Sequence, residues 1–253
     1  MKITFLGTGT SQGIPVIGCT CPTCRSTYYK DKRLRSSILI EEKNTHIVID
    51  AGPDFRQQML THQVNKLDAI LLTHEHIDHT GGLDDIRSYN YLQKQYMSIY
   101  CEKRVEESLK KEYFYVFENH NYPGIPKFNI IEIDETPFYI NNIKIIPIRI
   151  LHKELPILGF RINNFAYITD GKTIPEKEYD KLKGLDILVI NALRKKDHHS
   201  HFTLEEALME IEKISPHQAY ITHISHLMGT HKENEKLLPR NVKFAYDGLK
   251  IIV

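Results

Sequence analysis

The chain has 253 residues, of which 41% are hydrophobic and 26% are charged, a composition typical of a globular protein and not of a disordered or fibrous one. Lys and Arg number 33 and Asp and Glu 32, so the net charge of +1 argues against a surface that attracts polyanions as a whole. The apolar runs fall far short of the roughly 20 residues that span a bilayer, and the N-terminal segment 1–12 lacks the apolar core of a signal peptide. We therefore expect a cytoplasmic protein with no membrane partner, and a single domain over residues 1–253, because no linker or repeat divides the chain.

Short strand-like segments follow one another along the whole chain. One of them, which begins at Ile143, contains Pro147 and is therefore predicted to be an edge or bulged strand, because proline cannot donate to a sheet ladder. In chain order, strands are predicted at Lys2–Gly7, Ser37–Glu42, His46–Asp50, Asp68–Thr73, Ser98–Cys101, Phe128–Asp134, Ile143–Leu151, Ile157–Ile162, Phe165–Thr169, Asp186–Ile190, Gln218–Thr222, Lys243–Tyr246 and Leu249–Val253.

Helical patterns are interspersed among these strands. Helices are expected after Pro53, after Gly82 and near residues 103–117. The clearest helix follows Thr203, because Thr203 and Glu206 form a capping box and apolar residues then recur at helical spacing. Many strands with helices between them predict an α/β or α+β fold in which helices cover sheets.

The densest chemistry lies in the segment from His74 to His79, which reads H-x-H-x-D-H and directly follows a predicted strand. Imidazole and carboxylate groups suit Zn²⁺, Mn²⁺ or Fe²⁺, and four potential ligands within six residues favour a metal site over a surface loop that is merely rich in histidine. His152, Asp170 and His223 each follow a further predicted strand. Loops at strand ends are where functional groups collect on a rigid scaffold.

The cysteines form a second candidate metal site. Three of the four lie at positions 19, 21 and 24. Three thiols this close cannot all pair with one another in disulfides, and thiolates select Zn²⁺, so zinc is favoured over a redox-sensing cluster. Cys101 is most simply a small buried hydrophobic residue.

These motifs, in this order along the chain, resemble the metallo-β-lactamase fold, and the resemblance implies an αββα four-layer sandwich. It places His74, His76 and His152 on one divalent ion, Zn²⁺ or Mn²⁺, and Asp78, His79 and His223 on a second, with Asp170 bridging the two. It also implies that Asp50 orients one of these ligands by accepting the N–H on the far side of its ring, although Asp50 could equally be a turn residue.

The cysteine cluster narrows the resemblance to the PhnP-type phosphoribosyl cyclic phosphodiesterases. The resemblance implies a structural zinc in a loop near residues 19–24, held by four ligands of this chain: Cys19, Cys21, Cys24 and His226. The resemblance runs from the first strand to the end of the chain. It also suggests a homodimer.

The implied reaction is the opening of a small cyclic ribosyl phosphate by a hydroxide bound to the dinuclear centre. Asp78 and His201 are the candidate catalytic residues, and the resemblance makes His201 the general acid. For the adjacent His198 and His199 we favour a solvated loop over a catalytic role. The basic residues nearby, and Arg33 and Arg35, are left out of the site because runs of charge are usually solvated.

Other functions share parts of this pattern. A tRNase Z-like endoribonuclease has the dinuclear site, but the chain shows no counterpart of its tRNA-binding arm and no excess of positive charge, so a nucleic-acid partner is disfavoured and not excluded. Lactonases and thioesterases use the same H-x-H-x-D-H, and binding proteins of pyrroloquinoline quinone biosynthesis have a similar cysteine cluster. The small phosphodiester is the expected partner. The segment Tyr113–Pro126 is expected either to wall the substrate pocket, where it would govern substrate choice, or to form a dimer surface.

Overall fold

Two mixed seven-stranded sheets organise the computed structural model, which describes residues 1–118 and 124–253. The first sheet has the order β14-β1-β2-β3-β4-β5-β6, and the second has the order β13-β12-β11-β10-β9-β8-β7. The strands of the first sheet are β1 (Lys2–Gly7), β2 (Ser37–Glu42), β3 (Thr45–Ile49), β4 (Ala69–Leu71), β5 (Met97–Cys101), β6 (Phe128–Glu132) and β14 (Lys250–Ile252). Those of the second are β7 (Phe138–Ile140), β8 (Ile143–His152), β9 (Leu155–Ile162), β10 (Phe165–Tyr167), β11 (Ile187–Asn191), β12 (Gln218–Thr222) and β13 (Val242–Phe244).

Each sheet has an antiparallel half and a parallel half. In the first sheet the pairs from β14 to β3 are antiparallel and those from β3 to β6 are parallel. In the second sheet the pairs from β7 to β10 are antiparallel and those from β10 to β13 are parallel. Because parallel strands end at the same edge of a sheet, residues that follow β3 and β4, or β10 and β12, are gathered together.

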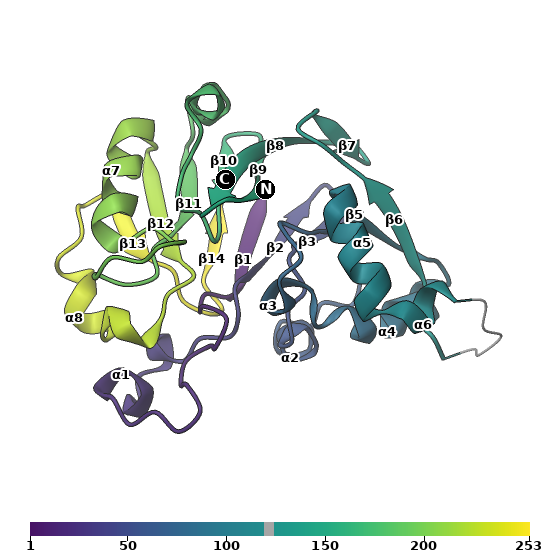
Figure 1. Ribbon diagram of the computed structural model, residues 1–253, viewed down its shortest axis with the longest axis horizontal. Coiled ribbons are helices and arrows are strands. Elements are labelled where there is room, and N and C mark those ends of the chain that lie inside the picture. Colours follow the sequence, from purple (N-terminus) through teal and green to yellow (C-terminus); the bar gives the residue numbers. More distant parts are fainter. Residues whose placement is uncertain (119–123) are drawn as a thin grey trace.

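Helices cover the outer faces of both sheets (Figure 1). The longest, α7, lies on the second sheet, and α2, α4 and α5 lie on the first. The α-helices are α1 (Pro22–Arg25), α2 (Phe55–Thr61), α3 (Ile77–Thr80), α4 (Arg87–Gln93), α5 (Lys103–Glu112), α6 (Phe114–Phe117), α7 (Leu204–Ile214) and α8 (His231–Glu235). The 3₁₀ helices are η1 (Tyr29–Asp31), η2 (Leu83–Ile86), η3 (Glu176–Leu182) and η4 (His226–Met228).

Three apolar layers hold these elements together. Side chains of both sheets, among them Phe5 and Phe160, fill the space between the sheets. Leu72 packs with Phe55 of α2 beneath the helices of the first sheet, and Ile190 packs with α7 on the second. The four layers are therefore helix, sheet, sheet and helix, which confirms the predicted αββα sandwich.

The structure corrects three of the predicted elements. The sequence pattern does not predict the strand β7, which pairs with the first residues of β8. The predicted helix over 103–117 is broken at Tyr113, where α5 gives way to the short α6. β8 is not an edge strand, but its ladder with β7 covers only Ile143–Ile145, so Pro147 lies beyond the end of β7 and its missing N–H breaks no bond on that side.

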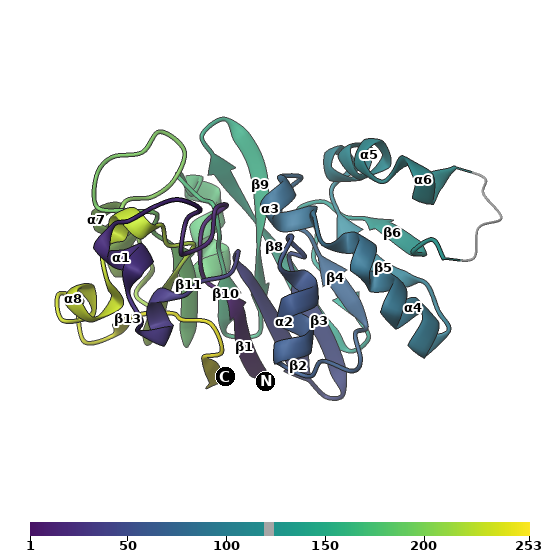
Figure 2. The same cartoon turned by 90° about the horizontal axis from the view of Figure 1, so that it is seen from below.

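The two chain termini lie side by side in the first sheet (Figure 2). The Val253 amide donates to the Met1 carbonyl at 2.9 Å, and the Met1 amine donates to the Val253 carbonyl at 2.9 Å. Among the helices of residues 1–118 and 124–253, none combines the length and the apolar character needed to cross a membrane.

Candidate active site

The H-x-H-x-D-H segment forms the turn that leads from β4 into α3. His74 is fully buried, His76 precedes the first turn of α3, and Asp78 and His79 lie within that helix. The turn that follows β3 packs closely against it, since the Ala51 amide donates to the His79 carbonyl at 2.7 Å. A Cβ atom at Gly52 would lie 2.0 Å from the Asp78 carbonyl oxygen, so only glycine permits this approach.

The remaining expected ligands lie at strand ends, as the sequence predicts. His152 is the last residue of β8, Asp170 follows β10 and His223 follows β12. Asp170 and His223 both have the left-handed backbone conformation, with φ of 56° and 54°. Non-glycine residues seldom adopt this conformation, which turns the chain sharply where each strand stops.

Four of the expected ligands converge on one point. The ligand atoms of Asp78, His79, Asp170 and His223 all lie within 4.8 Å of one another. The Nε2 atom of His79 is 3.1 Å from Asp170 Oδ2, and the Nε2 atom of His223 is 3.0 Å from Asp170 Oδ1. Asp170 thus lies between the two histidines.

The other expected ligands form a group of histidine rings beside this point. His74 Nε2 and His76 Nδ1 face each other at 2.9 Å. The ring of His152 lies 5.9 Å from that of His74 and 5.3 Å from that of His76, between centroids. His152 Nδ1 is 2.7 Å from the Asp170 carbonyl oxygen and therefore donates to it, which leaves Nε2 as the metal-binding atom.

Asp50 supports this cluster from behind. The residue is fully buried, has φ of 64°, and accepts hydrogen bonds from the Thr73 amide at 2.9 Å and from the Thr73 hydroxyl. Its Oδ2 atom is 2.7 Å from His79 Nδ1. An ionised carboxylate only accepts, so His79 carries its proton on Nδ1 and directs Nε2 towards the cluster.

The charges of the cluster oppose the effect of burial. Burial lowers the pKa of buried histidine, yet Asp170, Asp78 and Asp50 together raise the pKa of His79 well above its ordinary value. Burial also acts to lower the pKa of His223, but Asp170 and Asp78 raise it to about 9. Although burial opposes it, His223 and His79 hold the pKa of Asp170 well below its ordinary value. Protons therefore occupy the histidine nitrogens that a divalent ion would take, and metal binding would release them.

The donors fit divalent metal ions. Among the described residues, the buried Nε2 atoms of His79 and His223 face Asp170 without hydrogen-bond geometry, so their pairing is incomplete unless another group satisfies them. Imidazole nitrogen and carboxylate oxygen are the ligand types that Zn²⁺ and Mn²⁺ accept. The division of the seven ligands between two ions stays a prediction.

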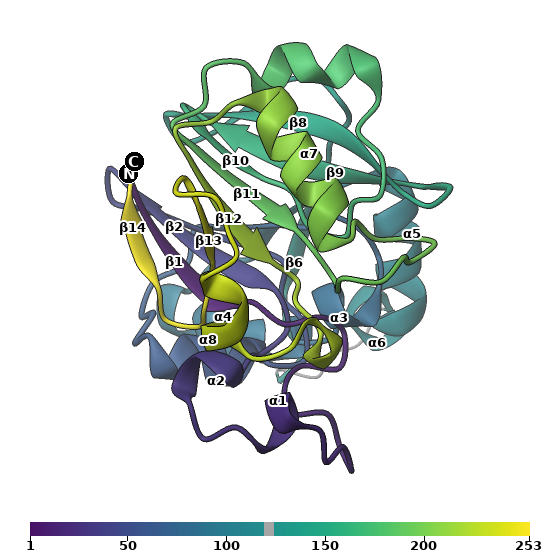
Figure 3. The same ribbon diagram turned by 90° about the vertical axis from the view of Figure 1, so that its left-hand side faces the viewer.

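The cysteine loop and His226 form a separate group that fits zinc. His226 Nδ1 lies 3.3 Å from Cys19 Sγ, 3.4 Å from Cys21 Sγ and 3.6 Å from Cys24 Sγ. A tetrahedral zinc with Zn–S of about 2.3 Å and Zn–N of about 2.0 Å has S–N edges of about 3.5 Å. Although burial opposes it, the Cys24 amide and His226 lower the pKa of the Cys21 thiol to about 6, which favours the thiolate that binds metal. The loop with α1 extends from the body of the protein (Figure 3).

His201 lies at the edge of the histidine–aspartate cluster. Its Nε2 atom is 3.1 Å from Asp170 Oδ1, and its ring lies between those of His152 and His223, at centroid distances of 4.6 and 5.1 Å. Burial lowers the pKa of His201 to about 4, and the hydrogen bond to Asp170 opposes this. The structure also brings His198 against it: the two Nδ1 atoms are 3.1 Å apart.

The basic residues that the sequence left aside have other partners. Arg33 is 4% exposed and donates to the Thr8 hydroxyl and the Ala245 carbonyl, so it serves the fold. Arg35 donates from a single guanidinium nitrogen, Nη1, to both carboxylate oxygens of Asp54. Of the segment Tyr113–Pro126, residues 119–123 lie outside the described part of the chain.

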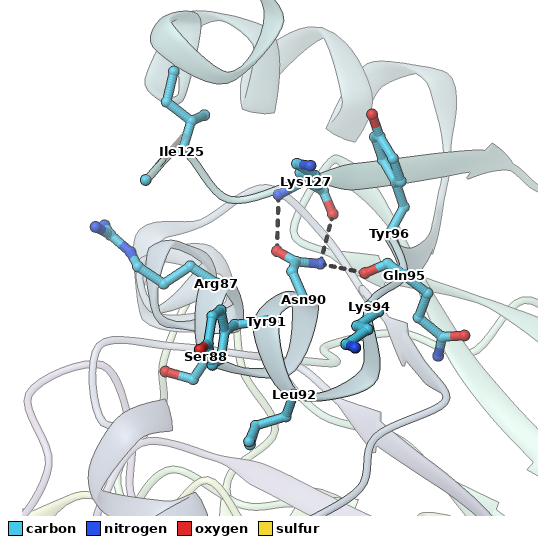
Figure 4. A pocket seen from close by; sticks show the side chains of 11 residues that line it. Arg87, Ser88, Asn90, Tyr91, Leu92, Lys94, Gln95, Tyr96, Ile125 and Lys127 are labelled. Atoms are coloured by element: carbon cyan, nitrogen blue, oxygen red, sulfur yellow. Dashed lines mark hydrogen bonds between the residues drawn. The ribbon is translucent and has the colours of Figure 1, made fainter. Parts of the chain in front are cut away.

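A cavity of about 1020 Å³ has no residue of this cluster in its lining (Figure 4). It is lined by α4 and the segment before β6, where Asn90 bonds to the backbone of Gln95 and Lys127. None of its described lining residues is a His, Cys, Asp or Glu. The candidate active site is therefore assigned to the histidine–aspartate cluster, which has acid, base and metal-binding groups that the cavity lacks.

Comparison with known proteins places these observations in a family. The family model described as "Beta-lactamase superfamily domain" matches residues 45–224. A solved structure described as a new diphosphatase from the PhnP family superposes with a TM-score of 0.93 and 37% identity, and the match covers 99% of this chain and 96% of that one. Zn²⁺-bound PqqB from Methylobacterium extorquens has a TM-score of 0.81 at 18% identity, covers 100% of both chains, and shows likeness of fold alone.

A curated relative has a different name. It is an octanoyltransferase of Porphyromonas gingivalis, 41% identical over 256 residues. The match covers 100% of this chain but 52% of the relative, so this chain spans about half the length of that protein.

Proposed function

Because the chain belongs to the β-lactamase superfamily and has the metallo-β-lactamase fold, we propose that it is a metal-dependent phosphodiesterase that opens a small cyclic ribosyl phosphate. The position of His201 carries the proposal. This histidine lies against Asp170 at the edge of the cluster, yet it is not one of the seven expected ligands. Opening a phosphodiester expels an alkoxide, and an alkoxide leaves readily only when a nearby acid protonates it.

Each residue of the site has a role in this proposal. His74, His76 and His152 would hold one ion, Asp78, His79 and His223 the other, and Asp170 would be shared. Two bound divalent ions would supply an activated water and would stabilise charge on the phosphoryl oxygens. In its protonated form, which burial disfavours and the bond to Asp170 favours, His201 donates the proton on Nε2 to the leaving oxygen. Asp50 keeps the ring of His79 in place.

A second candidate is a diphosphatase. The protein of 37% identity that covers nearly the whole chain is described by that activity. Cleavage of a phosphoanhydride expels a phosphate group, which is a much weaker base than an alkoxide and needs no proton donor. The two candidates therefore differ in their dependence on His201.

The octanoyltransferase name supports no third candidate. The relative that bears it is about twice as long as this chain, and the match covers only 52% of it. That name therefore does not decide the chemistry of the matched half.

Phosphorus NMR of the Mn²⁺-reconstituted protein tests the proposal. We expect 5-phosphoribosyl 1,2-cyclic phosphate to open to a monoester, and His201→Ala to slow the reaction by about 10²–10⁴-fold. His199→Ala, which alters an exposed neighbour, is the matched control and should change little. A nucleoside diphosphate hydrolysed equally well by wild type and His201→Ala, with no opening of the cyclic ester, would favour the diphosphatase. No turnover of the cyclic ester by fully metallated protein would refute the phosphodiesterase.

A further inference from the structure

Asn191, the last residue of β11, is a fully buried polar residue that is neither an expected metal ligand nor a candidate acid. Its side-chain amide makes two hydrogen bonds to a single residue, Gly171. The Gly171 N–H donates to Asn191 Oδ1 at 2.7 Å, and Asn191 Nδ2 donates to the Gly171 carbonyl at 2.9 Å. A backbone N–H only donates and a carbonyl only accepts, so these bonds fix the orientation of the amide. Asn191 therefore holds both polar groups of the Gly171 backbone.

Gly171 connects Asp170 with the loop that carries His201. It directly follows Asp170 in the chain. Its carbonyl also accepts a hydrogen bond at 2.8 Å from the amide of Phe202, the residue that follows His201. Beside this contact His201 Nε2 lies 3.1 Å from Asp170 Oδ1. A shift of the Gly171 backbone would therefore change how Asp170 and His201 lie relative to each other.

The backbone of Asp170 needs this support. Asp170 has φ of 56°, in the left-handed region that residues other than glycine seldom adopt. The Gly171 N–H points in a direction that the Asp170 backbone determines, so its bond to Asn191 favours one conformation of Asp170. The packing is close as well: a Cβ atom at Gly171 would lie 2.9 Å from Ile150 Cγ2, 3.1 Å from Phe202 Cε2 and 3.2 Å from Asn191 Oδ1. Gly171 thus has little room to move.

We propose that Asn191 is a positioning residue: it holds the Gly171 backbone and thereby places Asp170 and His201 against each other. This inference rests on the proposed function, in which Asp170 is the shared metal ligand and His201 the acid. Both polar ends of the Asn191 amide are bonded to Gly171. Asn191 therefore acts through the backbone and not on the substrate.

The chain contains a matched control for this pair of bonds. Gln93, the last residue of α4, holds Leu67 in the same way: the Leu67 amide donates to Gln93 Oε1 at 2.8 Å, and Gln93 Nε2 donates to the Leu67 carbonyl at 2.9 Å. Leu67 precedes β4, whereas the expected ligands follow that strand. Asn191→Leu and Gln93→Met each replace an amide by an apolar side chain of similar size. They should remove equivalent bonds, one pair at the cluster and one pair at the opposite end of a strand.

Titration with Co²⁺ against a competing chelator tests the inference without activity, because the visible absorption of Co²⁺ reports the geometry of its ligands. The bands of the histidine–aspartate cluster are those that Asp170→Ala removes. Asn191→Leu should change these bands and lower the affinity of the cluster for Co²⁺ by about 10-fold, and Gln93→Met should match wild type. Gly171→Ala, which pushes against Asn191 and keeps its amide, should change the same bands.

Two results of this titration would overturn the inference. One is a wild-type spectrum and affinity in folded Asn191→Leu, and the other is an equal change in Gln93→Met. If Asn191→Leu does not fold, Gly171→Ala decides the matter, because wild-type cluster bands in that variant would show that the placement of Gly171 does not affect Asp170.

Kinetics of the Mn²⁺-loaded protein test the link to His201. With 5-phosphoribosyl 1,2-cyclic phosphate, Asn191→Leu should lower kcat by about 10–100-fold, and Gln93→Met should leave it unchanged. In a His201→Ala background the further loss should be smaller, since residues that act as one unit are not additive. An undiminished loss in that background would overturn the inference. If wild type does not open the cyclic ester, the proposed function fails, and the Co²⁺ titration still decides whether Asn191 positions Asp170.

Discussion

Replacement of Asp50 by asparagine should weaken metal binding at His79 while leaving the chain folded. The carboxylate accepts from His79 Nδ1 at 2.7 Å and from the Thr73 amide at 2.9 Å. Asparagine has the same shape and tolerates the backbone φ of 64° at this position. Its single oxygen can keep the bond to the Thr73 amide, but its NH₂ group must then face His79. The ring would respond by accepting at Nδ1 and carrying its proton on Nε2, the atom that the metal needs.

The expected losses in metal affinity and in the free energy of unfolding distinguish weaker metal binding from unfolding of the chain. Loss of a group that orients a metal-binding histidine typically lowers metal affinity or activity by about 10–100-fold. The free energy of unfolding should fall by only about 1–2 kcal/mol, because one charge-assisted hydrogen bond is replaced by a neutral one. Asp50→Ala should cost about 3 kcal/mol or more, because it leaves the buried Thr73 amide and His79 Nδ1 without a partner.

Zn²⁺ titration against a competing chelator, with metal content by mass spectrometry, measures the affinity, and urea unfolding measures the stability. The matched control is Asp186→Asn, because Asp186 also lies 3.1 Å from a histidine nitrogen, on His217, but both side chains are exposed. The control should bind metal like wild type. Wild-type affinity for every ion in Asp50→Asn would refute the assignment of His79 as a ligand oriented by Asp50.

Three further predictions concern other parts of the molecule. Asp170→Ala should remove metal from the histidine–aspartate cluster and leave the cysteine-bound zinc, and an unchanged metal-to-protein ratio would contradict this. Cys21→Ser should release one ion and lower the melting temperature, with the cluster metals retained, whereas an unaltered melting curve and zinc count would argue against a structural zinc. Burial, aided by Arg33 and Lys30, lowers the pKa of His231 to about 4, so the folded state excludes a proton that the unfolded chain binds below about 6.5. The resulting stability is present above pH 6.5 and is lost as the pH falls towards 4. In His231→Asn the free energy of unfolding should therefore fall less steeply between pH 6.5 and 4, with a slope smaller than that of wild type by up to about 1 kcal/mol per pH unit. Equal slopes in wild type and variant would refute this.

Local patterns predicted most of the fold because they report burial directly. The bounds of β1, β2 and β12 agree with those read from the sequence, and Thr203 and Glu206 form the predicted capping box. The differences arise where tertiary contacts act. Tyr113 continues the apolar stripe of α5, but its hydroxyl donates to the Thr80 carbonyl, and its backbone leaves the helix to reach there. Such a contact between distant segments has no local sequence signal.

The sequence pointed to the residues of the candidate site but not to the orientations of their rings. Strand ends located His152, Asp170 and His223, because parallel strands bring their ends together. The sequence offered no reason to prefer His198 over His199. The two are neighbours in the same polar loop, and only the ring orientations show that His198 bonds to His201 while His199 lies outside it.

The backbone at three strand ends links the fold to the chemistry. Asp50, Asp170 and His223 follow β3, β10 and β12, and all three have the left-handed conformation. This conformation costs roughly 1–2 kcal/mol at a residue other than glycine, and glycine would adopt it freely. Glycine, however, would supply neither a carboxylate to His79 nor a nitrogen and an oxygen to the cluster. Strained, buried, ionisable residues at all three turns therefore support the same inference as the histidine nitrogens that face Asp170: this cluster can hold metal, and its backbone costs local stability.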